Sequence, residues 1–173
     1  MTTPTPSRRE SAITLRFMAE PTDMNIYRKV HGGTAMKWID QAGFACAAGW
    51  SGRPCVTVYV GGIRFYKPIT IGHLVEVQAR LIHTGRTSMH IAVDVNSRNL
   101  QTQVSEPTTH CVIVFVALDE EGHPVVVPPW EPQTEAEKAL QGYAQRLLAL
   151  SKKLEEEMCP YLPHCAVKGG KKA

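Results

Sequence analysis

The chain has 173 residues, of which 43% are hydrophobic and 20% are charged, a balance typical of one soluble globular domain. A net charge of +3 and an aromatic content of 7% give no basic, aromatic-rich surface, so we expect no nucleic-acid partner. The five cysteines are odd in number, and no apolar run suits a secretion signal or a membrane span, which predicts a cytoplasmic protein without a membrane anchor.

The first predicted elements are an arm, a strand and a loop. Residues 1–11 are rich in Thr, Pro and Ser, which predicts a mobile arm. Residues 12–18 alternate between apolar and polar positions, which is typical of a strand with one buried face. Residues 20–29 contain Pro, Asp and Asn, which favour a loop.

The stretch from residue 30 to residue 50 predicts the central helix. Small residues along it allow close packing, and a sheet is the expected cover. Asp40 lies at the edge of the apolar stripe, where a carboxylate needs a partner or a function. One interpretation pairs Asp40 with Lys37, three residues earlier. The predicted stripe consists of Met36, Ile39, Gly43, Cys46, Ala47 and Trp50.

The second interpretation of Asp40 comes from the start of this helix. His31, Gly32 and Gly33 precede the apolar stripe, and glycines let a ligand approach the free N–H groups of the first turn. Such a helix start favours anions and developing negative charge. Asp40 lies about two turns further on, where it is placed to act on a group whose oxygen binds at the helix start.

Four further strands and the turns between them complete the predicted core. Two of the strands follow each other closely and predict a hairpin. A central helix with strands before and after it predicts an α+β fold, in which an antiparallel sheet curls around the helix. The predicted strands are 55–65, 74–83, 88–96 and 108–118, and the predicted loops are 66–72, 97–107 and 119–124.

A second helix is predicted after the core, whose domain spans residues 12–132. Thr134 and Glu137 form a capping-box pattern, which predicts a helix over residues 133–158, its regular part starting near residue 135. Residues 159–173 are expected to form a flexible tail.

The sequence predicts neither a metal site nor a nucleophile among the cysteines. Cys159, His164 and Cys165 lie near one another but lack the paired spacing of a zinc site, so no metal is expected. Cys46 and Cys55 lie in apolar runs without an evident activating base, and they are interpreted as core residues.

An ordered set of motifs from residue 13 to residue 128 resembles the hotdog-fold acyl-CoA thioesterases, specifically the small bacterial YciA-type enzymes and the cytosolic acyl-CoA hydrolases of animals. Each fragment alone is weak, but their order and approximate spacing are specific. The motifs are TDMN, HGG, MKWIDQAG, VGGIRFYKPITIGHLVEV, TGRTSMHIAVDV and VIVFVALDEEGHP.

The resemblance implies hydrolysis of an acyl-CoA to a free acid and coenzyme A. Asp40 matches the family's catalytic carboxylate, as general base or as nucleophile. The N–H groups of Gly32 and Gly33 match the donors that polarise the thioester carbonyl. Asn25 matches an asparagine of the bacterial loop motif, and His31 is expected to form part of the pocket.

The resemblance also implies a coenzyme A site. Lys29 departs from the family, because relatives often carry Asn or Asp there, and this weakens any role for that side chain in positioning water. For the charged members of the expected site, an ordinary solvated surface position is the alternative. The expected substrate-binding residues are Val60, Gly61, Arg64, Lys67, Arg86 and Ser88.

The resemblance further implies a homodimer as the smallest active unit, with each site between two subunits, and a trimer of dimers as the full assembly. No cofactor is expected, since coenzyme A is part of the substrate. No GxSxG motif occurs, which argues against a serine esterase. Two alternatives stay open: a hotdog dehydratase or hydratase, and a non-catalytic regulator that binds acyl-CoA.

Overall fold

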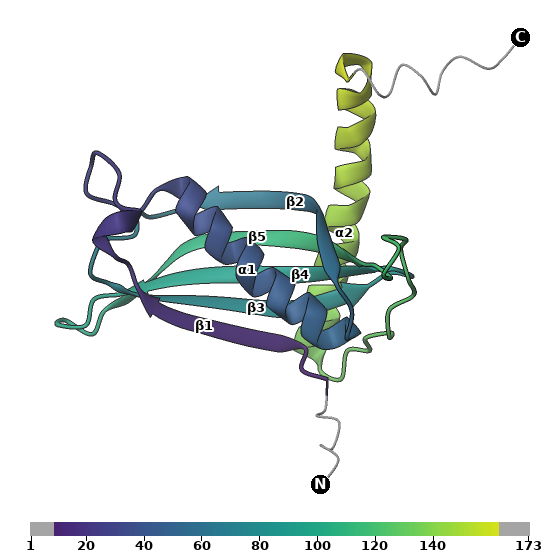
Figure 1. The fold of residues 1–173 in the computed structure, drawn as a ribbon, viewed down its shortest axis with the longest axis horizontal. Coiled ribbons are helices and arrows are strands. Elements are labelled where there is room, and N and C mark those ends of the chain that lie inside the picture. Colours follow the sequence, from purple (N-terminus) through teal and green to yellow (C-terminus); the bar gives the residue numbers. More distant parts are fainter. Residues whose placement is uncertain (1–8, 163–173) are drawn as a thin grey trace, which may run out of the picture.

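Five strands and two long helices form the protein in a computed structural model that describes residues 9–162 (Figure 1). The regular elements are β1 (Ala12–Met18), α1 (Gly32–Ser51), β2 (Cys55–Phe65), β3 (Leu74–Thr84), β4 (Ser88–Arg98), β5 (Ser105–Ala117) and α2 (Glu135–Met158). Two short 3₁₀ helices are η1 (Pro21–Asp23) and η2 (Cys159–Tyr161).

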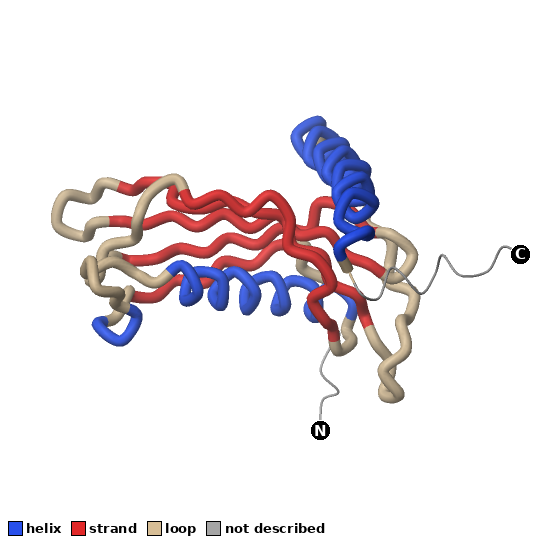
Figure 2. The backbone as a smooth tube through the Cα atoms, turned by 90° about the horizontal axis from the view of Figure 1, so that it is seen from above, coloured by secondary structure: helices blue, strands red, loops and turns tan. Residues whose placement is uncertain are grey.

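The strands form one antiparallel sheet in the order β1-β3-β4-β5-β2. The predicted hairpin is confirmed, because β3 pairs with β4 along its length. Helix α1 lies along one face of the sheet and α2 lies on the opposite face, the outer face (Figure 2). The α+β hotdog architecture predicted from the sequence is therefore confirmed, and β1 and β2 are the two edge strands.

Close packing between α1 and the sheet forms the main core. A Cβ atom on Gly43 would lie 2.8 Å from the ring of Phe115, so the small residue is needed there, as predicted. Met36 is 48% exposed, so its prediction as a stripe residue is wrong: in this turn of α1 the buried side chain is that of Ala35. The buried residues of α1 are Ala35, Trp38, Ile39, Ala42, Gly43, Cys46 and Ala47.

The first half of α2 packs on the outer face of the sheet. Ala144 is buried against Ile82, Ala92 and Val112, with Leu140, Tyr143 and Leu147 around them. The helix begins with the predicted capping box: the side chain of Thr134 accepts a hydrogen bond from the N–H of Glu137.

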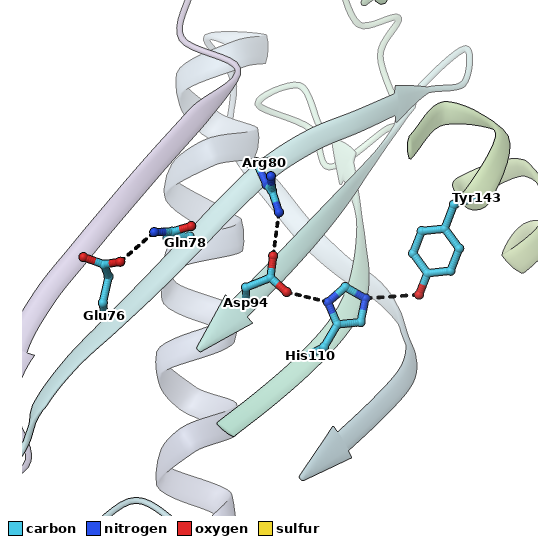
Figure 3. Close-up of polar contacts among 6 residues, drawn as sticks. All are labelled: Glu76, Gln78, Arg80, Asp94, His110 and Tyr143. Carbon is cyan, nitrogen blue, oxygen red and sulfur yellow. Dashed lines mark hydrogen bonds and ion pairs between the residues drawn. The ribbon is translucent and has the colours of Figure 1, made fainter. Parts of the chain in front are cut away.

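A polar network also holds α2 to this face (Figure 3). The ring of His110 lies between two partners: Nδ1 is 2.7 Å from Oδ1 of Asp94, and Nε2 is 3.1 Å from the hydroxyl of Tyr143. Arg80 donates a hydrogen bond to the same Asp94 carboxylate. The hydrogen bonds from His110 and Arg80 lower the pKa of Asp94 below its usual range.

The predicted loop over residues 97–107 is wrong at both ends. Strand β4 continues to Arg98 and β5 starts at Ser105, and these two residues are register partners. The residues there are polar, but ladder hydrogen bonds join backbone groups and need no apolar side chains. The loop is therefore limited to residues 99–104.

Two further predictions concern the ends of the chain and a membrane span. Most of the predicted N-terminal arm, together with His164 and Cys165, lies outside the described residues. Neither long helix between residues 9 and 162 is apolar enough over a sufficient length to cross a bilayer.

Candidate active site

Asp40 lies in the middle of α1, on the side that faces away from the main core. It is exposed and flanked one turn away by Met36 and Phe44, which are also exposed. Its Oδ1 accepts a hydrogen bond of 2.6 Å from the hydroxyl of Thr57 in β2. No ion pair between Asp40 and Lys37 occurs within the described part of the chain, so the structure ties the carboxylate to the edge strand instead.

The start of α1 has free hydrogen-bond donors. His31 is the N-cap residue, in an extended conformation, and its side chain makes no capping hydrogen bond. Gly32 and Gly33 are exposed, and their N–H groups bond no other residue in the range 9–162. An unsatisfied first turn of this kind binds an anion or a polarised oxygen.

A cavity of about 300 Å³ opens beside this helix start. Gly32 and Lys67 both line it, so the structure brings these two predicted site residues together. The ammonium group of Lys67 also forms an ion pair with Glu106. The remaining lining residues are mostly apolar, which suits an acyl or pantetheine group better than a phosphate.

Asn25 organises the loop that leads into α1. Its Oδ1 accepts hydrogen bonds from the N–H groups of Tyr27 and Lys29, at 2.9 and 3.1 Å. The enclosed Arg28 has a φ of 58°, a left-handed conformation that this turn stabilises. The Nζ atom of Lys29, the residue that departs from the family, donates a hydrogen bond of 3.0 Å to Thr70.

The other predicted substrate residues lie on β2 and around the β3–β4 turn. Val60 and Arg64 are exposed on the edge strand. Gly61 is buried because the ring of Tyr59 covers it: a Cβ atom there would lie 2.3 Å from that ring.

Two of these residues line a second cavity. Gly61 and Ser88 lie on the wall of a groove of about 520 Å³ between the sheet and α2. Arg86 is exposed in the adjacent turn, where its carbonyl accepts a hydrogen bond from Val127. A single protomer therefore leaves the predicted site in two parts, one on each face of the sheet.

The cysteines do not supply a nucleophile. Cys46 and Cys111 are buried, and burial raises the pKa of each thiol to about 12. Burial also raises the pKa of Cys55. The thiolate form that attacks a carbonyl is thus disfavoured at all three positions. Among the residues that the structure describes, no group of three His, Cys, Asp or Glu side chains could hold a metal.

Thr57 is the site residue that the sequence did not reveal. It lies in a run of β-branched residues, where a threonine is ordinary strand composition. Its hydroxyl faces α1 only because β2 passes the middle of that helix. The one available signal was its place among valines, as a polar side chain in an apolar strand.

The chemistry of these groups suits acyl transfer to water. An exposed carboxylate with a fixed hydrogen-bond donor can act as a base or as a nucleophile. The unpaired N–H groups of α1 can stabilise an oxyanion. Within one protomer, the carboxylate-bearing residue Asp40 and the helix start lie about 10 Å apart along the axis of α1. Gly33 and Asp40 are separated by seven residues, at a rise of about 1.5 Å each.

Comparisons with known proteins agree on one family. A model of the thioesterase superfamily matches residues 27–102. The chain is 33% identical over 136 residues to YkhA of Bacillus subtilis, named as an uncharacterized acyl-CoA thioester hydrolase, and the match covers 79% of each protein. It is 30% identical over 123 residues to the VdlD protein of Helicobacter pylori, covering 71% of this chain and 70% of VdlD.

Solved structures support the same assignment. A hexameric acyl-CoA thioesterase superposes with a TM-score of 0.80 at 34% identity, covering 83% of this chain and 92% of that one. An acyl-CoA hydrolase of Staphylococcus aureus, solved with butyryl coenzyme A and coenzyme A, gives a TM-score of 0.82 at 27% identity, covering 91% and 96%.

The Staphylococcus aureus enzyme has also been solved as three separate alanine variants, of an asparagine, an aspartate and a threonine. Those three positions follow the same order and the same separations along the chain as Asn25, Asp40 and Thr57. The chain therefore belongs to the thioesterase superfamily and, within it, to the hotdog-fold acyl-CoA thioester hydrolases.

Proposed function

We propose that the chain hydrolyses acyl-CoA with Asp40 as the catalytic carboxylate. The observation that carries this proposal is the hydrogen bond between Thr57 and Asp40, on an exposed face of α1. This contact leaves the second carboxylate oxygen of Asp40 available for water or for the thioester. Thr57 then acts as a positioning residue for the carboxylate.

The reaction needs one bond formed and one broken at the thioester carbonyl. As general base, Asp40 takes a proton from water while the water oxygen bonds to the carbonyl carbon. As nucleophile, an oxygen of Asp40 bonds to that carbon and forms an anhydride, which water then hydrolyses. In both routes the carbon–sulfur bond breaks, and coenzyme A leaves as a thiolate that water protonates.

The N–H groups of Gly32 and Gly33 supply the oxyanion hole in this proposal. They are preorganised by the helix, so they stabilise the negative oxygen without reorganisation. His31 and Asn25 shape the loop before these donors. The chain's own groups and water account for every step, and no cofactor is invoked.

Each site is formed by two protomers in this proposal. The edge strand β2 has no partner on its outer side within the described residues, and it exposes Val56, Val58 and Val60 beside it. Apolar side chains along a free strand edge favour pairing with a second copy. Such pairing brings Asp40 of one protomer toward the α1 start of the other and closes the gap of about 10 Å.

Three further parts of the proposal concern the assembly, the coenzyme A contacts and the location. Three of the solved neighbours are described as hexameric, which supports a trimer of dimers. Exposed Arg64 and Arg86 are proposed contacts for the coenzyme A phosphates. A cytoplasmic location is proposed because the described cysteines, Cys46, Cys55, Cys111 and Cys159, are all free.

Thiol release from acyl-CoAs of increasing chain length tests the activity. We expect turnover for at least one chain length, with the free acid as the second product. Hydration of an enoyl-CoA without thiol release would identify a hydratase instead. Saturable binding of acyl-CoA with neither reaction would identify a regulator.

A further inference from the structure

Helix α2 extends beyond the sheet that it covers. It crosses the strands on the outer face and runs past β2, so that its C-terminal half lies beyond the free edge (Figure 1). The first half ends its packing on the sheet near Leu147. The second half, residues 148–158, continues the same helix, but little of its own chain covers it.

This second half is more apolar than a solvated helix. Leu150 is 59% exposed, Leu154 is 52% exposed and Met158 is 45% exposed. Leu150, Leu154 and Met158 follow one another at spacings of four residues, so they lie along one side of the helix. We call these three side chains the ridge of α2. Exposed apolar surfaces of this kind mark contact surfaces.

The sheet edge below is apolar on the same side. Val56 precedes Thr57, and since Thr57 points toward α1, Val56 points toward the outer face. Val58 lies at a register shift between β2 and β5, and it faces the outer side because it lines the groove there. Both valines are exposed, and Val58 lines the groove of about 520 Å³ between the sheet and α2. The groove and the helical ridge thus meet at the free edge of β2.

We propose that the second half of α2 docks on a second copy of this chain, over the outer face of its β2 strand. This inference rests on the proposed pairing of two β2 edges. When two β2 edges pair, a helix that passes the edge of its own sheet lies over the sheet of the partner. Two-fold symmetry then places the partner's α2 in the groove of the first protomer.

A second copy is the occupant that fits both faces of this edge. On the inner face, the Asp40 site already needs a second protomer. On the outer face, the ridge on α2 and the valines of β2 are continuous with that contact. One isologous interface therefore covers the apolar surface on both sides of β2, and α2 clamps the dimer.

A matched pair of charged variants tests this clamp. Leu154→Glu places a carboxylate on the ridge, whereas Ala149→Glu adds the same charge on another side of the exposed helix. Sedimentation over a dilution series gives the dissociation constant of the dimer. We expect an increase of about tenfold or more for Leu154→Glu and no change for Ala149→Glu. Equal constants for the two variants would overturn the proposal.

Cross-linking between two differently tagged chains gives an independent readout. One chain carries Val56→Cys and the other carries Leu154→Cys, in a background where Cys159 and Cys165 are serine. A short bis-maleimide should join the two chains. The control replaces Val56→Cys with Thr14→Cys, on the far edge strand β1, and should give no product. Equal yields from both pairs would contradict docking on β2.

The outcomes separate this inference from the proposed function. A wild-type protein that releases thiol as a monomer would refute the proposed shared site and the clamp together. A wild-type dimer that is active, with equal dissociation constants for the two charged variants, would refute the clamp alone.

Discussion

The hydroxyl of Thr57 donates a hydrogen bond of 2.6 Å to the carboxylate of Asp40 and so joins the edge strand β2 to the middle of α1. An exposed aspartate on a helix would otherwise sample several rotamers. This contact holds one carboxylate oxygen of Asp40 in place. The placement of the proposed catalytic group thus depends on a tertiary contact between two elements.

Asp40→Asn should lower kcat by about a hundredfold or more, because the amide keeps the shape but is neither a base nor a nucleophile. KM should change little. Thiol release at saturating acyl-CoA measures the effect. Gln41→Ala, an exposed change on the next residue, is the control and should keep wild-type kcat. Equal activity of both variants would remove Asp40 from the mechanism.

Thr57→Val should lower kcat by about tenfold, because it removes the hydroxyl that orients Asp40 and keeps the shape of the side chain. KM should change little, because the hydroxyl is proposed to touch the carboxylate and not the substrate. Thr57→Ser retains the hydroxyl and should restore kcat. A wild-type kcat for Thr57→Val would show that this contact is only structural.

Gly32→Pro removes one N–H group from the start of α1 without disturbing the helix. Proline suits the first helical position, and His31 before it already has the extended conformation that proline requires. We expect kcat to fall by about a hundredfold if this N–H binds the oxyanion. Gly32→Ala keeps the N–H, and its Cβ would lie at an ordinary 3.9 Å from Phe65. It should therefore stay active, and equal losses in both variants would indicate a steric effect instead.

His90 should make the stability of the fold depend on pH. It is buried beside His83, and burial, followed by the charge of His83, lowers the pKa of His90 to about 4. In the unfolded chain the group titrates near 6.5, so the unfolded state binds more protons between these values. Stability is therefore complete above pH 6.5 and falls as the pH drops toward 4.

The size of this effect follows from the same shift. It amounts to at most about 3 kcal/mol in the free energy of unfolding. Urea unfolding from pH 7 to pH 4 measures it, with His90→Gln as the comparison. The variant should lose this part of the pH dependence. Parallel curves for the two proteins would place the titration elsewhere.

Local patterns were sufficient to predict most of the fold. The alternation in β3 and the capping box of Thr134 and Glu137 each depend on neighbours in the chain, and both agree with the structure. The ends of β4 and β5 were missed because Arg98 and Ser105 pair through backbone groups, which side-chain polarity does not report.

The candidate site was only partly predictable. Asp40 could be identified because a carboxylate near an apolar stripe is unusual. Its contact with Thr57 could not, since the contact depends on where β2 crosses α1. Likewise, Lys29 could be identified as a departure from the family because relatives often carry Asn or Asp there, but its hydrogen bond to Thr70 comes from packing between distant segments.

Activity in mixed dimers of two inactive variants tests the shared site most directly. Asp40→Asn and Gly32→Pro chains are refolded together and assayed for thiol release. If each site combines Asp40 of one protomer with the α1 start of the other, a mixed dimer has one intact site. Random mixing should then restore about a quarter of wild-type activity. A mixture no more active than its separate components would contradict a site shared between protomers.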